Sequence, residues 1–466
     1  MDRIPVELLQ KILAYLDLKS LGNAVLICRG FWDTFKSAEE VITTEILLRQ
    51  IDYDVLPEAI LVNMTWNLGI PSISKGIEFA KNLRHRQLPT TKWRLATALP
   101  IANFHKKVRY LAYQAAFEAL ERQPRLARES SMPTRNEMRR FERALYRFQL
   151  YCNVVGRWSL PEQTELHDVF FKYFATWENE QLACVHEHFV RIVSLQRLEA
   201  FNFLVQHDIS WGYLRIPYID GHWSHYAQGI LSRGLESIYQ LSKAENYYEC
   251  RHLLGRGGDK NGVPFCVRGF LSYGLQVGAN SRIPPQVRLS QMSEEDKAGV
   301  CAKPFYEDPD PGPAAMWRWV YRDAEGKLVA DPGMINHRGW AFPFWDLSRL
   351  QTAGLLGDPE IPGPLAPGDL GMERWRALEN LNSLEESRRR RRQIRICGGT
   401  GFYDPRGKSK IKWETSDKII SGEILMVQPR SLEEARRYLN VCAKYPVKRP
   451  EAAVQDIPDL GEGYRP

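Results

Sequence analysis

The sequence predicts a mainly α-helical protein whose C-terminal half is rich in loops and contains few short strands. Three observations lead to this fold class. Apolar side chains recur at three- and four-residue steps through much of the N-terminal half, which is the period of a helix buried on one side. Thr134 with Glu137, and Ser159 with Glu162, match the capping box that opens a helix. From about Gly258 onward glycine and proline become frequent, and both favour turns.

These patterns divide the chain into three predicted parts. Residues 1–45 form an N-terminal helical module, and residues 46–257 form an irregular helical body. Residues 258–466 form a loop-rich, aromatic region, which is the candidate for binding a partner or a substrate.

The first element begins at Pro5, which suits the first turn of a helix, and Glu7 suits the positive end of the helix dipole. Apolar residues on one face follow at positions 8, 9, 12 and 16, and a second segment repeats the rhythm at 18, 21, 25 and 28. The pattern predicts two short helices joined at a tight corner around Leu18. A unit of about 40 residues cannot bury all these side chains alone. Either the rest of the chain or another protein must cover them.

The order of residues in this segment is informative. It runs Ile4-Pro5-x-Glu7-Leu8-Leu9, Ile12, Leu16, Leu18, Leu21, Ile27-Cys28 and Phe31. This order resembles an F-box, the helical module by which substrate receptors dock on the Skp adaptor of cullin–RING ubiquitin ligases. The departures from the family pattern are Ile4 for the usual Leu, Gly22 where Leu is common, and Phe31 followed by Trp32 where Trp is usual. Gly22 costs about 1 kcal/mol of helix propensity.

The resemblance implies which side chains face the adaptor or pack the module itself. They are Ile4, Pro5, Leu8, Leu9, Ile12, Leu16, Leu21, Ile27, Cys28 and Phe31. It also implies the partners: the Skp adaptor, through it a cullin–RING ligase, and a protein substrate.

The body is expected to contain helices over 38–50, 56–67, 73–83 and 105–122. The helix opened by Thr134 has an apolar stripe from Met138 to Cys152, and its flanking arginines at 139, 140, 143 and 147 are expected to be solvated. Residues 140–148 and 174–182 also resemble stretches that are frequent in large F-box proteins of filamentous fungi.

The C-terminal region begins with an acidic connector, 307–313, that is expected to be exposed. The aromatic clusters 316–321 and 340–345 either fill a core or form the floor of a recognition groove. Further expectations are a linker over 357–371, a helix over 372–392, a strand pair around Ile411 and 420–427, a capped helix from Ser431 and a disordered end from Val447.

Composition limits the classes of function. The net charge is +7, from 63 basic and 56 acidic residues. Six arginines, Arg388 to Arg392 and Arg395, carry most of it, since 7 − 6 leaves +1. A general polyanion-binding surface is therefore not expected. Eight cysteines without a Cys-x-x-Cys pair indicate reduced thiols. The sequence shows no signal peptide and no apolar run of about 18 residues. Together with the reduced thiols, these features predict a protein of the cytoplasm or nucleus.

The sequence contains no convincing site for catalysis, a cofactor or a metal. The glycines around Thr400 lack the Lys-Ser/Thr pair of a phosphate-binding loop. Cys184, His186 and His188 lie two residues apart, and on a helix such neighbours point in nearly opposite directions. We expect a buried cysteine, solvated histidines and a protein that is not an enzyme.

The function that these features predict is a substrate-receptor subunit of a Skp–cullin–F-box (SCF) ubiquitin ligase, which recruits its substrate through the C-terminal part. One alternative is a scaffold that holds the adaptor without ubiquitylation. A second is a nuclear nucleic-acid-binding protein that uses the arginines from Arg388 to Arg392.

Overall fold

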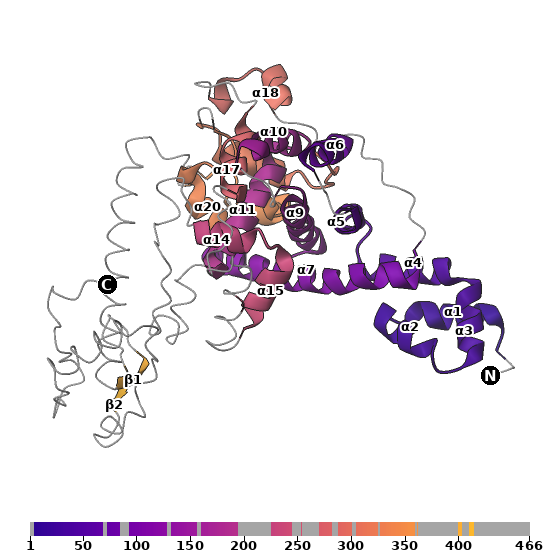
Figure 1. The fold of residues 1–466 in the computed structure, drawn as a ribbon. Helices are drawn as coiled ribbons and strands as arrows, with labels where there is room; N and C mark the ends of the chain where they lie inside the picture. The colour runs from indigo at the N-terminus through magenta and orange to yellow at the C-terminus, as the bar shows by residue number, and fades with distance from the viewer. Residues whose placement is uncertain are drawn as a thin grey trace, which may run out of the picture.

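Figure 1 shows the fold in a computed structural model. The structure describes residues 4–68, 72–83, 93–127, 132–155, 160–193, 225–244, 253, 270–281, 288–300, 304–324, 327–358, 361, 399–402 and 410–413. Within these ranges, no helix is both long enough and apolar enough to cross a membrane.

The N-terminal segment forms three helices, α1 (Val6–Tyr15), α2 (Leu18–Ala24) and α3 (Arg29–Ser37), not the two that periodicity predicted. Asp17 caps α2 by accepting hydrogen bonds from the backbone N–H groups of Lys19 and Ser20. The second predicted helix is split because Cys28 adopts an extended backbone, with φ −154°, and begins a new helix. Gly22 weakens the helix just before this break.

Two longer helices hold this module, α4 (Glu39–Gln50) and α7 (Leu95–Arg122). Arg49 of α4 donates a hydrogen bond to the Leu16 carbonyl at 2.5 Å, and the Glu39 carboxylate accepts one from the Leu95 N–H at 3.2 Å. Figure 1 shows α7 running from the module into the body of the protein. This helix begins ten residues before the predicted start at 105, and Pro100 lies inside it.

The predicted helices at 38–50, 56–67 and 73–83 are confirmed within one residue. The remaining helices of the body and the C-terminal region are α5 (Leu56–Leu68), α6 (Ile73–Leu83), α8 (Pro124–Ala127), α9 (Arg135–Val154), α10 (Leu160–Phe171), α11 (Thr176–Val193), α14 (His225–Leu231), α15 (Leu235–Lys243), α17 (Phe270–Gln276), α18 (Glu294–Val300), α19 (Gly312–Val320), α20 (Ile335–Gly339) and α21 (Leu347–Thr352). Four short 3₁₀ turns accompany them within the described ranges: η1 (Gly278–Asn280), η2 (Leu289–Gln291), η3 (Pro332–Met334) and η4 (Phe342–Phe344).

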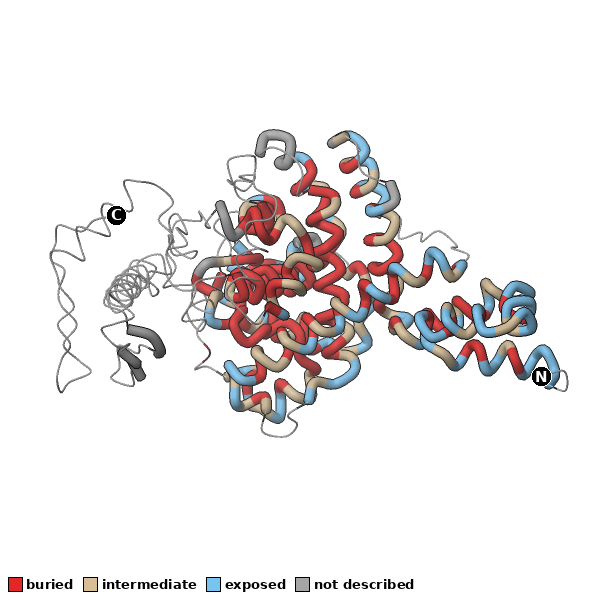
Figure 2. The backbone as a smooth tube through the Cα atoms, turned by 60° about the horizontal axis from the view of Figure 1, so that its bottom comes forward, coloured by how far each residue is buried: buried red, intermediate tan, exposed pale blue. Residues whose placement is uncertain are grey.

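The core is built around α9 and α11. Both helices are buried on nearly all sides, because α5, α7, α15, α17 and the C-terminal elements surround them. Figure 2 shows the buried residues concentrated in this body, whereas the N-terminal helices are largely exposed or half-buried. The expected mainly helical fold is confirmed.

The aromatic clusters of the C-terminal region belong to the same core. Trp317 and Trp345 have no exposed surface, and the Phe141 ring of α9 stacks on Phe344 at a centroid distance of 4.0 Å. The core interpretation of these clusters is confirmed, because side chains without exposed surface cannot form the floor of an open groove.

One small antiparallel pair of strands is described, β1 (Gly399–Phe402) and β2 (Lys410–Trp413). A strand at Ile411 is confirmed, but its partner is β1, and the predicted partner at 420–427 lies outside the described residues. Other predictions also lie outside them: the boundary at 257/258, most of the linker, the helix over 372–392 with its arginines, and the segments from Ser431 onward.

Candidate partner-binding face of the N-terminal helices

Half of the predicted adaptor-facing residues are exposed. Ile4, Pro5, Leu8, Ile12 and Ile27 lie at the surface, and the exposed fraction is 51% for Leu8 and 71% for Ile27. Large aliphatic side chains gain about 1.5–3 kcal/mol each when they are buried. Their exposure leaves this part of the module suited to contact with another protein.

The other half points inward or lies at the edge. Leu9 and Leu21 are buried, and Leu16, Cys28 and Phe31 are half-buried. Leu21 joins Leu13, Leu18, Val25 and Phe35 in the hydrophobic cluster that continues into α4 and α7. These residues pack the module and fix the geometry of the exposed ones.

Sequence reasoning missed four exposed apolar side chains of the same N-terminal segment. They are Val6, Tyr15, Leu26 and Trp32. Tyr15 follows Leu8 and Ile12 at the i, i+4, i+7 spacing of one helix face, so the same periodicity could have found it. We call Leu8, Ile12 and Tyr15 the α1 stripe. The Arg49 guanidinium of α4 lies 5.7 Å from the centre of the Tyr15 ring, which stays largely exposed.

Charged and polar side chains join α1 to α3 and α3 to α4, and a charged side chain caps α2. The Gln10 amide donates to the Ser37 hydroxyl at 3.2 Å, which joins α1 to α3. The Lys36 ammonium lies over the Trp32 ring and pairs with Glu39 at 2.8 Å. Hydrogen bonding from the Ser20 backbone N–H lowers the pKa of Asp17, so this cap stays ionised.

Comparison with protein families assigns this module. The family model of the F-box domain matches residues 1–37. The chain carries an F-box domain. F-box domains generally bind the Skp adaptor within cullin–RING ligases. The match ends where α3 ends, so α4 and α7 lie outside the F-box domain and hold it from its inner side.

Neither the curated proteins nor the solved structures contain a match to this chain. The F-box domain is therefore the assigned part, and the roles of its individual residues in adaptor binding stay predictions.

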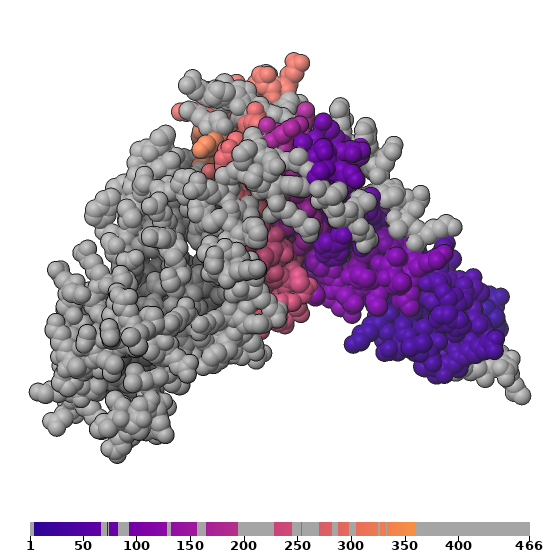
Figure 3. Space-filling model, viewed as in Figure 1, coloured from indigo at the N-terminus to yellow at the C-terminus, as the bar shows by residue number. Residues whose placement is uncertain are grey.

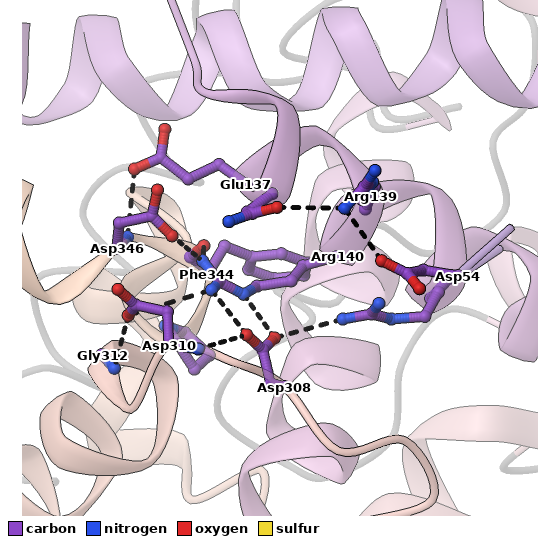
Figure 4. Close-up of polar contacts among 12 residues, drawn as sticks. Asp54, Glu137, Arg139, Arg140, Asp308, Asp310, Gly312, Phe344 and Asp346 are labelled. Carbon is purple, nitrogen blue, oxygen red and sulfur yellow. Dashed lines mark hydrogen bonds and ion pairs between the residues drawn. The ribbon is translucent and has the colours of Figure 1, made fainter. Parts of the chain in front are cut away.

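A cluster of ion pairs lies inside the body, around α9 (Figure 4). Arg140 has a fully buried side chain, and its guanidinium pairs with Asp308 at 2.7 Å and with Asp346 at 2.7 Å. Arg143 also donates to Asp308, at 3.1 Å. Arg147 donates to Glu178 at 2.7 Å. The expectation of solvated arginines along this helix was wrong for these three, which are buried, because neighbouring elements cover them and supply the carboxylates. Arg139 is half-buried and pairs with Asp52 and Asp54.

The acidic connector, which was expected to be exposed, is exposed only in part: Pro309 and Pro311 are exposed, Asp308 and Asp310 are half-buried, and Gly312 and Pro313 are buried. Asp308 is held by the arginines of α9, and the Asp310 carboxylate accepts hydrogen bonds from the Gly312 and Leu347 N–H groups at 2.7 and 2.8 Å. Glu307 is exposed as predicted. The connector fastens the C-terminal elements to α9, and this network has a structural role.

The cysteine and histidines of α11 do not form a metal site. Cys184 is buried as expected, but His186 and His188 are buried too, which corrects the prediction of solvated rings. Burial lowers the pKa of His186 to about 3, and its Nε2 lies 3.2 Å from Gln228 Oε1. No group of three metal-binding side chains is found among the described residues.

Proposed function

We propose that this chain is the substrate-receptor subunit of a Skp–cullin–F-box ubiquitin ligase. Its F-box domain would dock on the Skp adaptor, and the rest of the chain would recruit a protein substrate. The proposed role requires no bond chemistry in this chain, since the ligase supplies it. It implies a location in the cytoplasm or the nucleus.

The α1 stripe is the observation that carries this proposal. Leu8, Ile12 and Tyr15 are exposed on one face of a helix whose opposite face is packed into the core through Leu13. A helix with two apolar faces needs a second surface to cover it. Within an F-box domain, the Skp adaptor is the partner that such a face fits.

The way in which the F-box domain is attached supports the receptor role. Helix α7 has 28 residues and spans about 42 Å at 1.5 Å per residue, from the F-box domain to α11. Glu118 near its C-terminal end pairs with Arg191 of α11 at 3.1 Å. A substrate bound to the body would be held near the adaptor, which raises its effective concentration beside the ubiquitin carrier.

Co-purification with the Skp adaptor tests the docking step. We expect the full chain to form a stoichiometric complex and the Leu8→Asp/Ile12→Asp variant to lose it. Leu9 is unsuitable for this test because it is buried and a charge there would unfold the domain. The matched control is Tyr53→Asp/Val277→Asp, two exposed residues outside the F-box domain, which should bind normally.

Two results would contradict the proposal. One is a folded wild-type chain that does not bind the adaptor, and the other is an α1-stripe variant that binds as well as the control. Deletion of this chain separates a receptor from a scaffold. A protein that binds the chain should accumulate after the deletion if the chain is a receptor, and should keep its level if the chain is a scaffold. A nucleic-acid-binding protein would give a different result. It would bind nucleic acid with an affinity that falls steeply with salt, and it would lose this binding when Arg388 to Arg392 are neutralised.

A further inference from the structure

The long helix α7 has a second surface that the F-box assignment does not explain. Lys106, Tyr110 and Tyr113 lie on one face of α7, and Tyr239 and Lys243 of α15 lie beside them. We call these five residues the α7–α15 face. Figure 3 shows the molecule hollowed below α7, between α15 and the F-box domain.

Aromatic rings form the middle of this face. The Tyr110 and Tyr239 rings meet edge to face at a centroid distance of 5.2 Å and join the two helices. Tyr113 is 38% exposed and stacks on Phe117, one turn further along α7. Exposed aromatic rings held rigidly by neighbouring rings are typical anchor points of protein interfaces.

Two lysines accompany the rings, one over a ring face and one a helical turn away. The Lys243 ammonium lies 4.0 Å from the centre of the Tyr110 ring, and Lys106 is exposed one turn before Tyr110. Neither ammonium forms an ion pair with a described residue. Lys107 differs, because it pairs with Glu236 on α15.

The two lysines define which partner can cover these rings. An apolar surface would strip water from both ammonium groups without pairing them, and an unpaired buried charge costs several kcal/mol. A partner with carboxylates beside an apolar side chain satisfies the lysines and the rings together. A phosphate backbone fits less well, because the Glu236 carboxylate beside Lys107 would repel its continuous negative charge, whereas a peptide can place its few carboxylates at Lys106 and Lys243 alone.

We infer that the α7–α15 face binds an acidic segment of the substrate protein, with an apolar side chain on Tyr113 and carboxylates on Lys106 and Lys243. This inference rests on the proposed receptor function. The site lies on the helix that carries the F-box domain, so a substrate held there would lie next to the adaptor.

The test is selection from a displayed library of short random peptides against the full chain, both alone and bound to the Skp adaptor. We expect enriched peptides to carry Asp or Glu beside an aliphatic or aromatic residue. Their affinity should fall about tenfold for Lys106→Glu/Lys243→Glu and for Tyr113→Ser. Lys75→Glu and Tyr53→Ser, which alter an exposed lysine and an exposed tyrosine elsewhere, serve as matched controls.

The inference is overturned if no acidic peptides are enriched, if the face variants bind them as well as the controls, or if a labelled polyuridine RNA competes for the face with higher affinity. Circular dichroism of each variant establishes that it is folded. Adaptor binding is measured on the same samples. If the wild-type chain does not bind the adaptor, the proposed function is wrong. The peptide selection on the chain alone would still decide whether this face binds acidic segments.

Discussion

The Arg140 guanidinium forms a two-pronged ion pair with Asp308, which lies 168 residues further along the chain. Its Nε lies 2.7 Å from Oδ2 and its Nη2 lies 2.8 Å from Oδ1 (Figure 4). The third nitrogen donates to Asp346 and to the Phe344 carbonyl. All three nitrogen atoms at the tip of this buried side chain therefore have partners, and they connect α9 to two separate C-terminal segments.

Arg140→Met is expected to destabilise the protein by about 3–5 kcal/mol, because it leaves the largely buried Asp346 carboxylate without its cation and leaves Asp308 with Arg143 alone. The free energy of unfolding in urea, followed by circular dichroism, measures this change. Arg29→Met is the matched control, since its pairing with Asp33 spans 3.8 Å between exposed side chains and should not affect the unfolding midpoint. Equal midpoints for the two variants would show that the Arg140 network does not stabilise the fold.

Glu58 and Glu178 both lie close to the Arg147 guanidinium and should respond oppositely to replacement by glutamine. Glu178 accepts hydrogen bonds from Arg147 and from the Ala175 and Phe305 N–H groups. The Glu58 oxygens accept none, and the nearest Arg147 nitrogen is 3.6 Å away. We expect Glu178→Gln to destabilise the protein by about 2–4 kcal/mol and Glu58→Gln to stabilise it at neutral pH.

The gain from Glu58→Gln should depend on pH. Burial raises the pKa of Glu58 from 4.5 to about 7, because the Arg147 charge only partly offsets the lost hydration. Between these two values the unfolded chain releases its proton and the folded chain keeps it, so the free energy of unfolding falls as pH rises. The glutamine variant lacks this loss. The free energy of unfolding of Glu58→Gln should exceed that of the wild type by almost nothing at pH 4.5 and by about 3 kcal/mol above pH 7.

Urea unfolding of both proteins across this pH range checks the prediction. Glu142 is also buried with its pKa raised to about 7, so the variant should keep part of the wild-type pH dependence. A constant difference between Glu58→Gln and wild type at all pH values would contradict the assignment of this titration to Glu58.

The contrast between α9 as predicted and α9 as observed shows what sequence periodicity can resolve. The stripe from Met138 to Cys152 and the capping box at Thr134 gave the position of the helix correctly. The arginines flanking this stripe were expected to be solvated because an apolar stripe predicts a helix that is buried on one side only. Asp308 and Asp346 reach Arg140 only through the tertiary fold, and local pattern carries no information about such distant partners.

The F-box domain shows a similar limit at smaller scale. The family pattern placed both Leu8 and Leu9 in one set, but Leu8 is exposed and Leu9 is buried. The distinction depends on where α4 and α7 pack, and neither helix belongs to the matched residues. Tyr15 could have been found from its spacing, whereas its contact with Arg49 required the structure.

Thr134→Ala should cost more than the loss of an ordinary helix cap. The Thr134 hydroxyl accepts from the Glu137 N–H at 3.2 Å, as the capping box predicts, and also donates to Asp346 at 2.6 Å. A lost cap costs about 1 kcal/mol, and the second hydrogen bond brings the expected total to about 2 kcal/mol. Thr134→Ser keeps the hydroxyl and should remain close to wild type in urea unfolding. A serine variant as unstable as the alanine variant would assign the effect to the lost methyl group instead.

Replacing a glycine by alanine should stabilise the protein at one position and destabilise it at another. At Gly22, inside α2, an added Cβ would meet nothing within 4 Å, so Gly22→Ala should raise the stability of the F-box domain by up to about 1 kcal/mol through helix propensity. At Gly234 the backbone has φ +85°, and a Cβ would lie 2.6 Å from the Gln149 oxygen that accepts the Leu235 N–H.

Gly234→Ala should therefore destabilise the start of α15 by more than about 1 kcal/mol, from backbone strain and from displacement of Gln149. Hydrogen exchange of the backbone amides separates the two effects. Protection should increase in α2 for Gly22→Ala, with adaptor binding kept, and decrease in α15 for Gly234→Ala, with weaker binding of acidic peptides at the α7–α15 face. If Gly22→Ala instead loosens α2, the departure from the usual Leu at this F-box position has a packing reason that helix propensity does not describe.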